Sequence, residues 1–262
     1  MTNAALHVAR TGLDAQNEKM RVIANNLANV NTTGFKRDRA NFETLAYQQI
    51  TAPGAQATDQ NKYATGLNLG SGVQIQGTAR IDTQGSMQIT GNSLDMAVQG
   101  AGFFQVLKPD GSMGYTRDGS FSQTQDGTVV TSDGMPLQPQ IQIPEGATTI
   151  TIGSDGTVSA TLQGQNAPSV VGKIQTVRFM NPSGLQADGN NLLSESAASG
   201  APQVGDPGTD GRGTIAQGSL ESSNVDITEE LVDMIETQRA YEVNSKVIKA
   251  TDEMLQTANQ QL

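Results

Sequence analysis

The hydrophobic positions of this chain are most regular at its two ends. Residues 226–262 contain no proline and no glycine, although the whole chain has 29 glycines. Apolar side chains recur every seven residues along this segment, at Ile227, Met234, Tyr241, Ile248, Leu255 and Leu262. This period indicates one apolar face of a long α-helix. Asp226, with Glu229 three residues later, predicts a capping box at the start of that helix.

The N-terminal end has a matching pattern. Apolar and small side chains follow one another at spacings of three and four, with Gln16 in one position of the series, at Leu6, Ala9, Leu13, Met20, Ile23, Leu27 and Val30. This is a heptad repeat, and Gly34 can adopt the left-handed conformation that often follows a helix end. Residues 1–40 carry an excess of Lys and Arg, whereas residues 226–262 carry an excess of Asp and Glu. The opposite charges favour pairing of the two predicted helices.

A pair of such helices is weakly stable by itself, because the entropy lost on ordering the residues exceeds what one apolar stripe returns. We therefore predict that both terminal segments become helical on packing against other copies or partners. An ordinary intramolecular coiled coil is the alternative.

The middle of the chain has a pattern typical of short strands and turns. Residues 47–83 are rich in Gln, Thr, Gly and Ala, and predict a loop or extended arm that ends in a half-buried strand at 73–81. Asp-Gly pairs begin at residues 110, 118, 126 and 133, and this dipeptide favours two-residue hairpin turns because both residues can adopt positive φ. We predict an antiparallel meander with strands at 103–107, 148–152, 157–162 and 172–180, followed by a loop and linker at 195–213.

These patterns together predict an α+β fold. Long N- and C-terminal helices form a coiled-coil-like inner domain, and an antiparallel β domain is inserted between them. The expected boundaries are 1–33 and 226–262 for the helical domain, 34–83 and 212–225 for an extended connecting region with a loop arm, and 84–211 for the β domain.

Composition narrows the possible functions. The net charge is -10 and the pI is near 4.5, with no stripe of Arg and Lys among aromatic residues, which argues against a nucleic-acid partner. The chain has no cysteine, which excludes disulfides, thiol catalysis and thiolate metal sites. No apolar run suggests a secretory signal or a membrane span.

Candidate chemistry is sparse. His7 is the only histidine and has no partner base or second ligand near it in the sequence. Gly211, Gly213 and Ala216 fit a loose dinucleotide pattern but follow a polar linker and no strand. Asp206 and Asp210 resemble the start of a calcium loop that has Gln217 where a glutamate is required. We expect no catalytic residue, no metal site and no cofactor.

Two other functional classes stay open on the residues alone. A secreted β-rich hydrolase would use two of the turn aspartates as paired carboxylates, although the glycine after most of them favours turn formation. A monomeric adhesin-like binding module would not need its terminal segments.

Four motifs resemble those of a known family, the axial rod and hook proteins of the bacterial flagellum. Residues 24–37, ANNLANVNTTGFKR, are similar to its N-terminal rod motif. Residues 94–106, LDMAVQGAGFFQV, with YTRDGSF at 115–121, are similar to its β-domain signature. Residues 218–225, GSLESSNV, and 238–246, QRAYEVNSK, are similar to the C-terminal motif of the distal rod members. The resemblance covers nearly the whole chain and departs mildly at Asn3, His7 and Glu18.

The resemblance implies a structural protein and not an enzyme. The expected function is that of a distal rod subunit, which self-assembles into a rigid hollow helical tube that transmits torque and conducts exported subunits. A proximal rod or hook-type axial subunit is the alternative. The implied partners are copies of the chain itself, proximal rod and hook subunits, the surrounding P- and L-ring proteins and the flagellar type III export apparatus. The implied location is the basal-body rod across the periplasm, reached without a cleaved signal peptide.

The resemblance also indicates which side chains pack between subunits. The apolar ones are Leu13, Met20, Ile23, Leu27, Met234, Tyr241, Ile248 and Leu255. Hydrogen bonds between subunits are expected from Asn25, Asn26, Asn29, Gln238 and Asn244. The arm at 47–66 is expected to lie across neighbouring subunits and to keep the tube straight.

Overall fold

The computed structural model describes residues 2–54, 56, 64–164 and 167–260, without the side chains of residues 2–5, 255 and 258–260. The chain forms two compact units. The helical unit consists of residues 1–27, 38–79 and 226–262, and the β unit consists of residues 28–37 and 80–225. The predicted connecting region is divided between these units, and its existence as a separate part stays a prediction.

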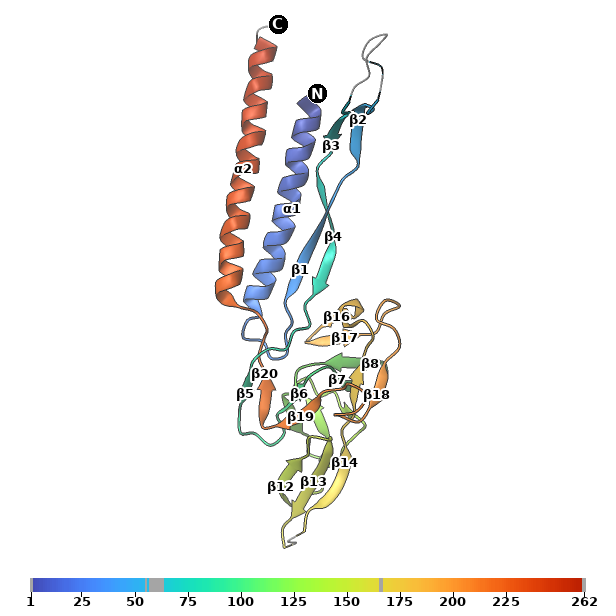
Figure 1. Cartoon of the computed structure of the whole chain (residues 1–262). Coiled ribbons are helices and arrows are strands. Elements are labelled where there is room, and N and C mark those ends of the chain that lie inside the picture. Colours follow the sequence, from blue (N-terminus) through green and yellow to red (C-terminus); the bar gives the residue numbers. More distant parts are fainter. Residues whose placement is uncertain (1, 55, 57–63, 165–166, 261–262) are drawn as a thin grey trace. The chain divides into compact units, whose positions relative to one another are not determined.

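The helical unit contains the two predicted helices, α1 (Thr2–Ala28) and α2 (Ile227–Gln260). They run in opposite directions, and α1 lies between α2 and a long β-ribbon (Figure 1). The predicted cap of α2 is present, because Asp226 Oδ1 accepts hydrogen bonds from the N–H groups of Thr228 and Glu229 at 2.8 and 3.3 Å. Gly34, after the end of α1, has the predicted positive φ of 69°.

The ribbon beside α1 is more regular than the predicted loop or arm. β1 (Asp38–Thr44) pairs with β4 (Val73–Arg80), and β2 (Tyr47–Thr51) pairs with β3 (Leu67–Gly70). Gly72 has a φ of 116° and lies so close to α1 that a Cβ atom would approach Thr11 Oγ1 to 2.1 Å. A larger residue at this position would push the ribbon away from the helix.

The helices are formed and in contact within a single chain, as in the alternative of an intramolecular helix pair. That the two terminal segments become helical only on packing against other copies or partners stays a prediction, which amide hydrogen exchange of the dilute monomer would test.

The β unit is antiparallel in every strand pairing that the structure describes there. Its largest sheet has seven strands in the order β16-β17-β8-β7-β15-β18, with β11 also paired to β7. A three-stranded sheet, β12-β13-β14, and the pairs β9-β10, β6-β19 and β5-β20 complete the unit. The bounds are β5 (Met87–Ile89), β6 (Met96–Gln99), β7 (Phe103–Leu107), β8 (Met113–Thr116), β9 (Phe121–Gln123), β10 (Val129–Thr131), β11 (Leu137–Gln138), β12 (Ala147–Ile152), β13 (Thr157–Leu162), β14 (Ser169–Lys173), β15 (Thr176–Arg178), the 3-10 helix η1 (Pro182–Gly184), β16 (Gln186–Gly189), β17 (Leu192–Ser194), β18 (Gln203–Gly205), β19 (Thr214–Gln217) and β20 (Ser219–Glu221).

Two clusters of buried side chains form the core of the β unit. The larger one includes Phe104 and Phe121, whose rings meet edge to face with centroids 5.2 Å apart. The smaller one is built around Phe179, which contacts Phe103 and Tyr115 in the same manner. Few aromatic rings thus hold the unit: Phe103, Phe104 and Tyr115 of the seven-stranded sheet contact Phe121 of β9 and Phe179, which follows β15.

Some β predictions need correction. The strand expected at 172–180 is interrupted after Lys173, and β15 begins at Thr176. The segment 195–213 is not only a loop, since it contains β18. In three of the four Asp-Gly pairs only the glycine adopts positive φ, at Gly111, Gly127 and Gly134, and in the pair Asp118-Gly119 neither residue does. The hairpin between β7 and β8 has five connecting residues, 108–112, so that it is not the predicted two-residue turn.

Candidate assembly surface

The inner face of α2 meets α1 along a polar seam. Four polar side chains are spaced seven residues apart and are buried or half-buried there, namely Glu230, Thr237, Asn244 and Thr251. Asn26 Nδ2 on α1 donates a hydrogen bond to Glu230 Oε1 at 3.1 Å. Further along, Gly12 lets the helices approach, since a Cβ atom there would be 3.1 Å from Asn244 Nδ2. The buried side of α2 therefore carries polar residues at heptad spacing, whereas the buried apolar side chains of α1 are Ala9, Ala15 and Ile23.

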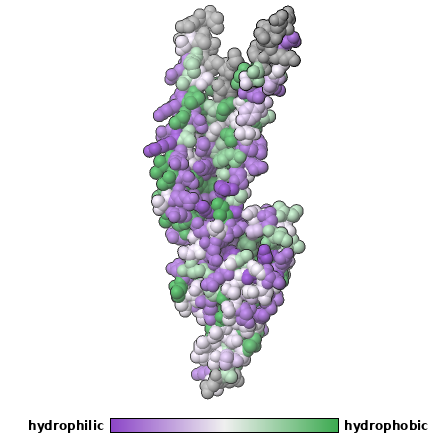
Figure 2. All heavy atoms as spheres, viewed as in Figure 1, coloured by the Kyte–Doolittle hydropathy of each residue, from purple (hydrophilic) through white to green (hydrophobic). Residues whose placement is uncertain are grey.

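The apolar side chains of α2 are largely exposed. Their exposed fractions are 48% for Ile227, 43% for Leu231, 51% for Val232, 50% for Ile235, 40% for Tyr241, 59% for Val243, 46% for Val247 and 65% for Met254. In Figure 2, green apolar patches alternate with purple polar ones along the helical unit. Scattered single apolar residues are normal at a surface, but a whole series along one helix marks an interaction surface.

The predicted apolar packing residues lie at different depths. Ile23 is buried, while Leu13, Met20 and Leu27 are half-buried on α1. Beside the polar seam, Met234 and Ile248 are half-buried and Tyr241 is more exposed. The side chain of Leu255 lies outside the described part. Their role in packing between subunits stays a prediction.

The predicted amide residues do not act as one group. Asn26 is only 2% exposed, and its partners lie in its own chain: Nδ2 also donates to the backbone oxygen of Asp38 at 2.9 Å, and Oδ1 accepts from the N–H of Asp38 at 3.0 Å. Asn26 therefore holds the start of β1 against α1. Asn25 and Gln238 are exposed, and Asn29 belongs to the β unit, where its Oδ1 accepts from Thr32 Oγ1 at 3.1 Å.

The β unit contains a buried ion cluster that the sequence did not indicate. Glu221, on β20, is fully buried. Its Oε1 accepts from Lys36 Nζ and from the N–H of Gly85, and its Oε2 lies 3.2 Å from Arg117 Nη1. Burial lowers the pKa of Lys36 and of Arg117, and the charge of Glu221 partly offsets this effect. One fully buried carboxylate thus bonds to two buried cations, and the charge of the nearby Asp82 adds to their compensation.

Residues around this cluster join distant segments of the chain. Asn224 Oδ1 accepts from the N–H of Arg37 at 2.7 Å, and its Nδ2 donates to the backbone oxygen of Ile81 at 2.8 Å. Gly34 donates its N–H to the backbone oxygen of Glu221 at 2.8 Å, and a Cβ atom there would be 2.7 Å from the Arg117 carbonyl carbon. Three of the quoted motifs therefore meet at one place.

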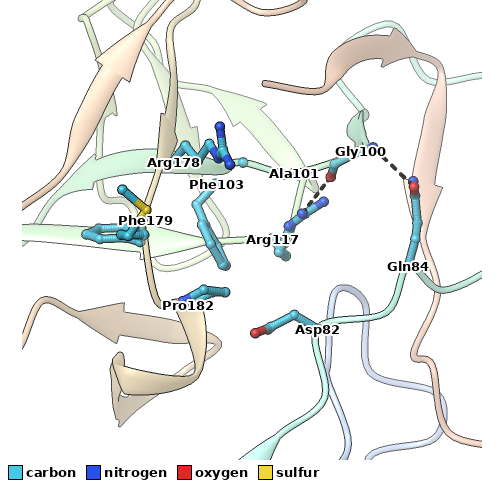
Figure 3. Close-up of a pocket in the computed structure, with 11 residues that line it drawn as sticks. Asp82, Gln84, Gly100, Ala101, Phe103, Arg117, Arg178, Phe179 and Pro182 are labelled. Carbon is cyan, nitrogen blue, oxygen red and sulfur yellow. Dashed lines mark hydrogen bonds between the residues drawn. The ribbon is translucent and has the colours of Figure 1, made fainter. Parts of the chain in front are cut away.

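A hollow of about 370 Å³ lies beside this cluster (Figure 3). Arg117 Nη2 donates to the backbone oxygen of Gly100 at 2.7 Å, and the Arg117 guanidinium is 5.2 Å from the centre of the Phe103 ring. Both carboxylate oxygens of Asp82 are buried without a hydrogen-bond partner, and burial raises the pKa of this group. The hollow is lined by Asp82, Gln84, Gly100, Ala101, Gly102, Phe103, Arg117, Arg178, Phe179, Met180 and Pro182.

The turn aspartates bind their own turns. Asp110 Oδ1 accepts hydrogen bonds from the N–H and the hydroxyl of Ser112, and Asp155 binds Thr157 in the same manner. Within the described residues, no group of three or more acidic or histidine side chains could hold a metal ion. No helix in the same part of the chain is long and apolar enough to cross a membrane.

Comparison with known proteins identifies the chain. Three family models match it: "Flagella basal body rod protein" at residues 6–36, "Flagellar hook protein FlgE/F/G D1 domain" at 97–160 and "Flagellar basal body rod FlgEFG protein C-terminal" at 216–261. The flagellar basal-body rod protein FlgG of Buchnera aphidicola (Acyrthosiphon pisum) is 49% identical over 98% of both chains. FlgG of Caulobacter vibrioides is 47% identical over 98% of both chains, and FlgG of Bacillus subtilis is 39% identical over 96% of both.

The chain belongs to the flagellar basal-body rod protein family. The predicted identity as a distal rod subunit of the flagellar basal body is confirmed, as is the α+β arrangement of terminal helices around an inserted antiparallel β region. The family is structural and non-enzymatic. The hydrolase interpretation is therefore wrong.

Proposed function

We propose that this rod subunit self-assembles into a rigid, hollow helical tube that crosses the periplasm, transmits torque and conducts exported subunits through its bore. Its neighbours in the assembly are copies of itself, proximal rod and hook subunits, the P- and L-ring proteins and the type III export apparatus. The chain reaches this place through that apparatus. Of the alternatives, a proximal rod or hook-type subunit has less support from the relatives.

The observation that carries the proposal is the exposed apolar series along α2. A soluble monomer normally buries such residues, and here the seam with α1 is polar instead. Copies of the same chain supply matching apolar surface, and contacts between unlike faces of identical subunits generate an open helical assembly. In such an assembly the helical domain forms the inner wall of the tube, the β domain lies outside it, and the connecting region joins the two.

Sedimentation velocity at rising concentration tests the proposal. We expect the full chain to change from monomers to an open-ended series of larger particles that electron microscopy shows as tubes. Particles that stop at one size, or a chain that stays monomeric at every concentration, would contradict self-assembly into a shaft.

The β2-β3 hairpin is proposed to lie across neighbouring subunits. A two-stranded ribbon is marginal in water, and this one exposes Tyr47, Ile50, Leu67 and Leu69 by 40–63%. Contacts with neighbours would bury these residues and restrict bending. We expect that replacing residues 47–70 by a short turn yields curved or flexible tubes, while tubes that remain straight would refute this role.

A further inference from the structure

The strand β5 is an open edge of the β unit. Among the described strands it pairs only with β20, in a sheet of two strands, so one side of its backbone faces away from that sheet. Ile89 on this strand is 85% exposed, more than any other large apolar side chain in the described part of the chain. The surrounding residues 83–94 include no charged residue. Proteins normally protect an edge strand with charges, proline, a bulge or a cover, because an open edge pairs with other chains.

Two other edges of the same unit are covered by side chains of the chain itself. At the edge of β12, Gln217 Oε1 accepts from the N–H of Ile152 at 3.0 Å, and Gln217 Nε2 donates to the backbone oxygen of Ile150 at 2.9 Å. At the edge of β18, Arg212 Nη2 donates to the backbone oxygen of Val204 at 3.3 Å. Among the described residues, no side chain covers the backbone of β5 in this manner.

The strand β14 is a second open edge. It is the last strand of the three-stranded sheet, and Val170 on it is 70% exposed. Pro168 and Lys173 limit the open part to residues 169–172, a length close to that of β5. Residues 156–172 include no charged residue, although the net charge of the chain is -10. Because copies of an acidic chain repel one another, uncharged edges are the places where two copies can approach.

We infer that β5 of one copy pairs with β14 of the next copy and so extends the three-stranded sheet across the contact. Ile89 then lies against Val170, and the backbone groups of both open edges gain hydrogen bonds. Within one β unit, β5 and β14 lie on opposite sides (Figure 1). The contact therefore joins unlike faces and continues from copy to copy without ending at a dimer. The inference rests on the proposed self-assembly and adds to it a contact between β units.

Pairing of β5 with β5 of a second copy is the main competing arrangement. It would also bury Ile89 and cover the edge, but such a contact has two-fold symmetry and ends at a dimer. It would leave Val170 exposed.

Cysteine crosslinking distinguishes the two arrangements, because the chain has no cysteine. The full-length double variant Ile89→Cys/Val170→Cys is treated with a short bismaleimide at concentrations where sedimentation shows that it self-associates. We expect a ladder of dimers, trimers and longer products under denaturing conditions. A mixture of the two single variants should give dimers only, and each single variant alone should give no crosslinked product.

Ile89→Cys/Val204→Cys is the matched control, since Val204 is also exposed, at 44%, but lies on the edge that Arg212 covers. A ladder with this control as strong as with the first pair would overturn the inference, as would dimers from Ile89→Cys alone. Normal self-association with no ladder from the first pair would overturn it too, while leaving the proposed function intact. Absence of any self-association in the unsubstituted chain would instead refute the proposed function and the inference with it.

A lysine on the open edge gives a second test without crosslinking. Ile89→Lys should leave the melting of the β unit unchanged, because this side chain is already exposed. It should raise the concentration needed for self-association by roughly tenfold or more, since a charged edge no longer pairs. Val204→Lys should leave that concentration unchanged. Self-association of Ile89→Lys at the same concentration as the unsubstituted chain would contradict the contact.

Discussion

Replacing Glu221 by glutamine should severely destabilise the β unit. Glutamine keeps the size of the side chain and can still accept the N–H of Gly85, but it removes the negative charge between Lys36 and Arg117. Because Glu221 is fully buried, water cannot compensate the two cations that remain. Breaking a buried ion pair from one side typically costs about 3–5 kcal/mol.

This cost is a large fraction of the stability of an ordinary domain, which is about 5–15 kcal/mol. For a domain of about 150 residues, each kcal/mol lowers the melting temperature by about 2–4 °C, so the expected decrease is roughly 6–20 °C. Near-UV circular dichroism of the purified chain measures it, because the buried aromatic rings of the β unit report its packing. Denaturant unfolding followed by the same signal gives the free energy.

Glu145→Gln is the control, since Glu145 is exposed and the same chemical change should alter the melting temperature little. A double-mutant cycle with Lys36→Met measures the coupling directly. If Glu221→Gln costs less than about 1 kcal/mol, an ordinary neutral hydrogen bond explains the site and the argument from buried charge is wrong.

Three further substitutions test other parts of the account. Asn26→Ala removes the three hydrogen bonds that this buried side chain makes to Asp38 and Glu230, at a cost of about 1–3 kcal/mol. Sedimentation should therefore show a rise of roughly 5- to 150-fold in the concentration needed for self-association, and no rise would contradict the role of Asn26 in holding β1 against α1. Burial raises the pKa of Asp82, so its ionised form destabilises the folded state at neutral pH and the penalty fades as pH falls through the folded pKa. Asp82→Asn should therefore raise the melting temperature at pH about 7 but not below about 3.9, and a decrease at neutral pH would refute this sign. Leu27→Asp should abolish self-association while the near-UV signal and melting of the β unit stay intact, and normal polymerisation would contradict the packing role of Leu27.

The long elements of the fold were predictable because each carries its own periodicity. The heptads of the termini and the alternation at residues 73–81 specify α1, α2 and β4 without knowledge of their neighbours. One continuous strand was predicted at 172–180. The structure breaks it near the buried Ile174 because β14 and β15 pair with different sheets, and that pairing depends on distant parts of the chain. β18 was missed for a similar reason, since its three residues are a strand only through pairing with β15.

The buried ion cluster could not be predicted from the sequence. Lys36, Arg117 and Glu221 are far apart along the chain, and a charged residue in a sequence is most often exposed. The polar seam was also missed. Glu230, Thr237, Asn244 and Thr251 have the same period as the apolar series, and periodicity alone does not decide which face of a helix meets its own chain and which meets another.

Amide hydrogen exchange along α2, compared between the dilute monomer and the assembled state, tests the central claim most directly. The claim is that copies of the same chain cover the apolar outer faces of α2. It predicts weak protection of residues 227–260 in the monomer and strong protection of the same amides after assembly. Strong protection in the monomer that does not change with concentration would contradict it.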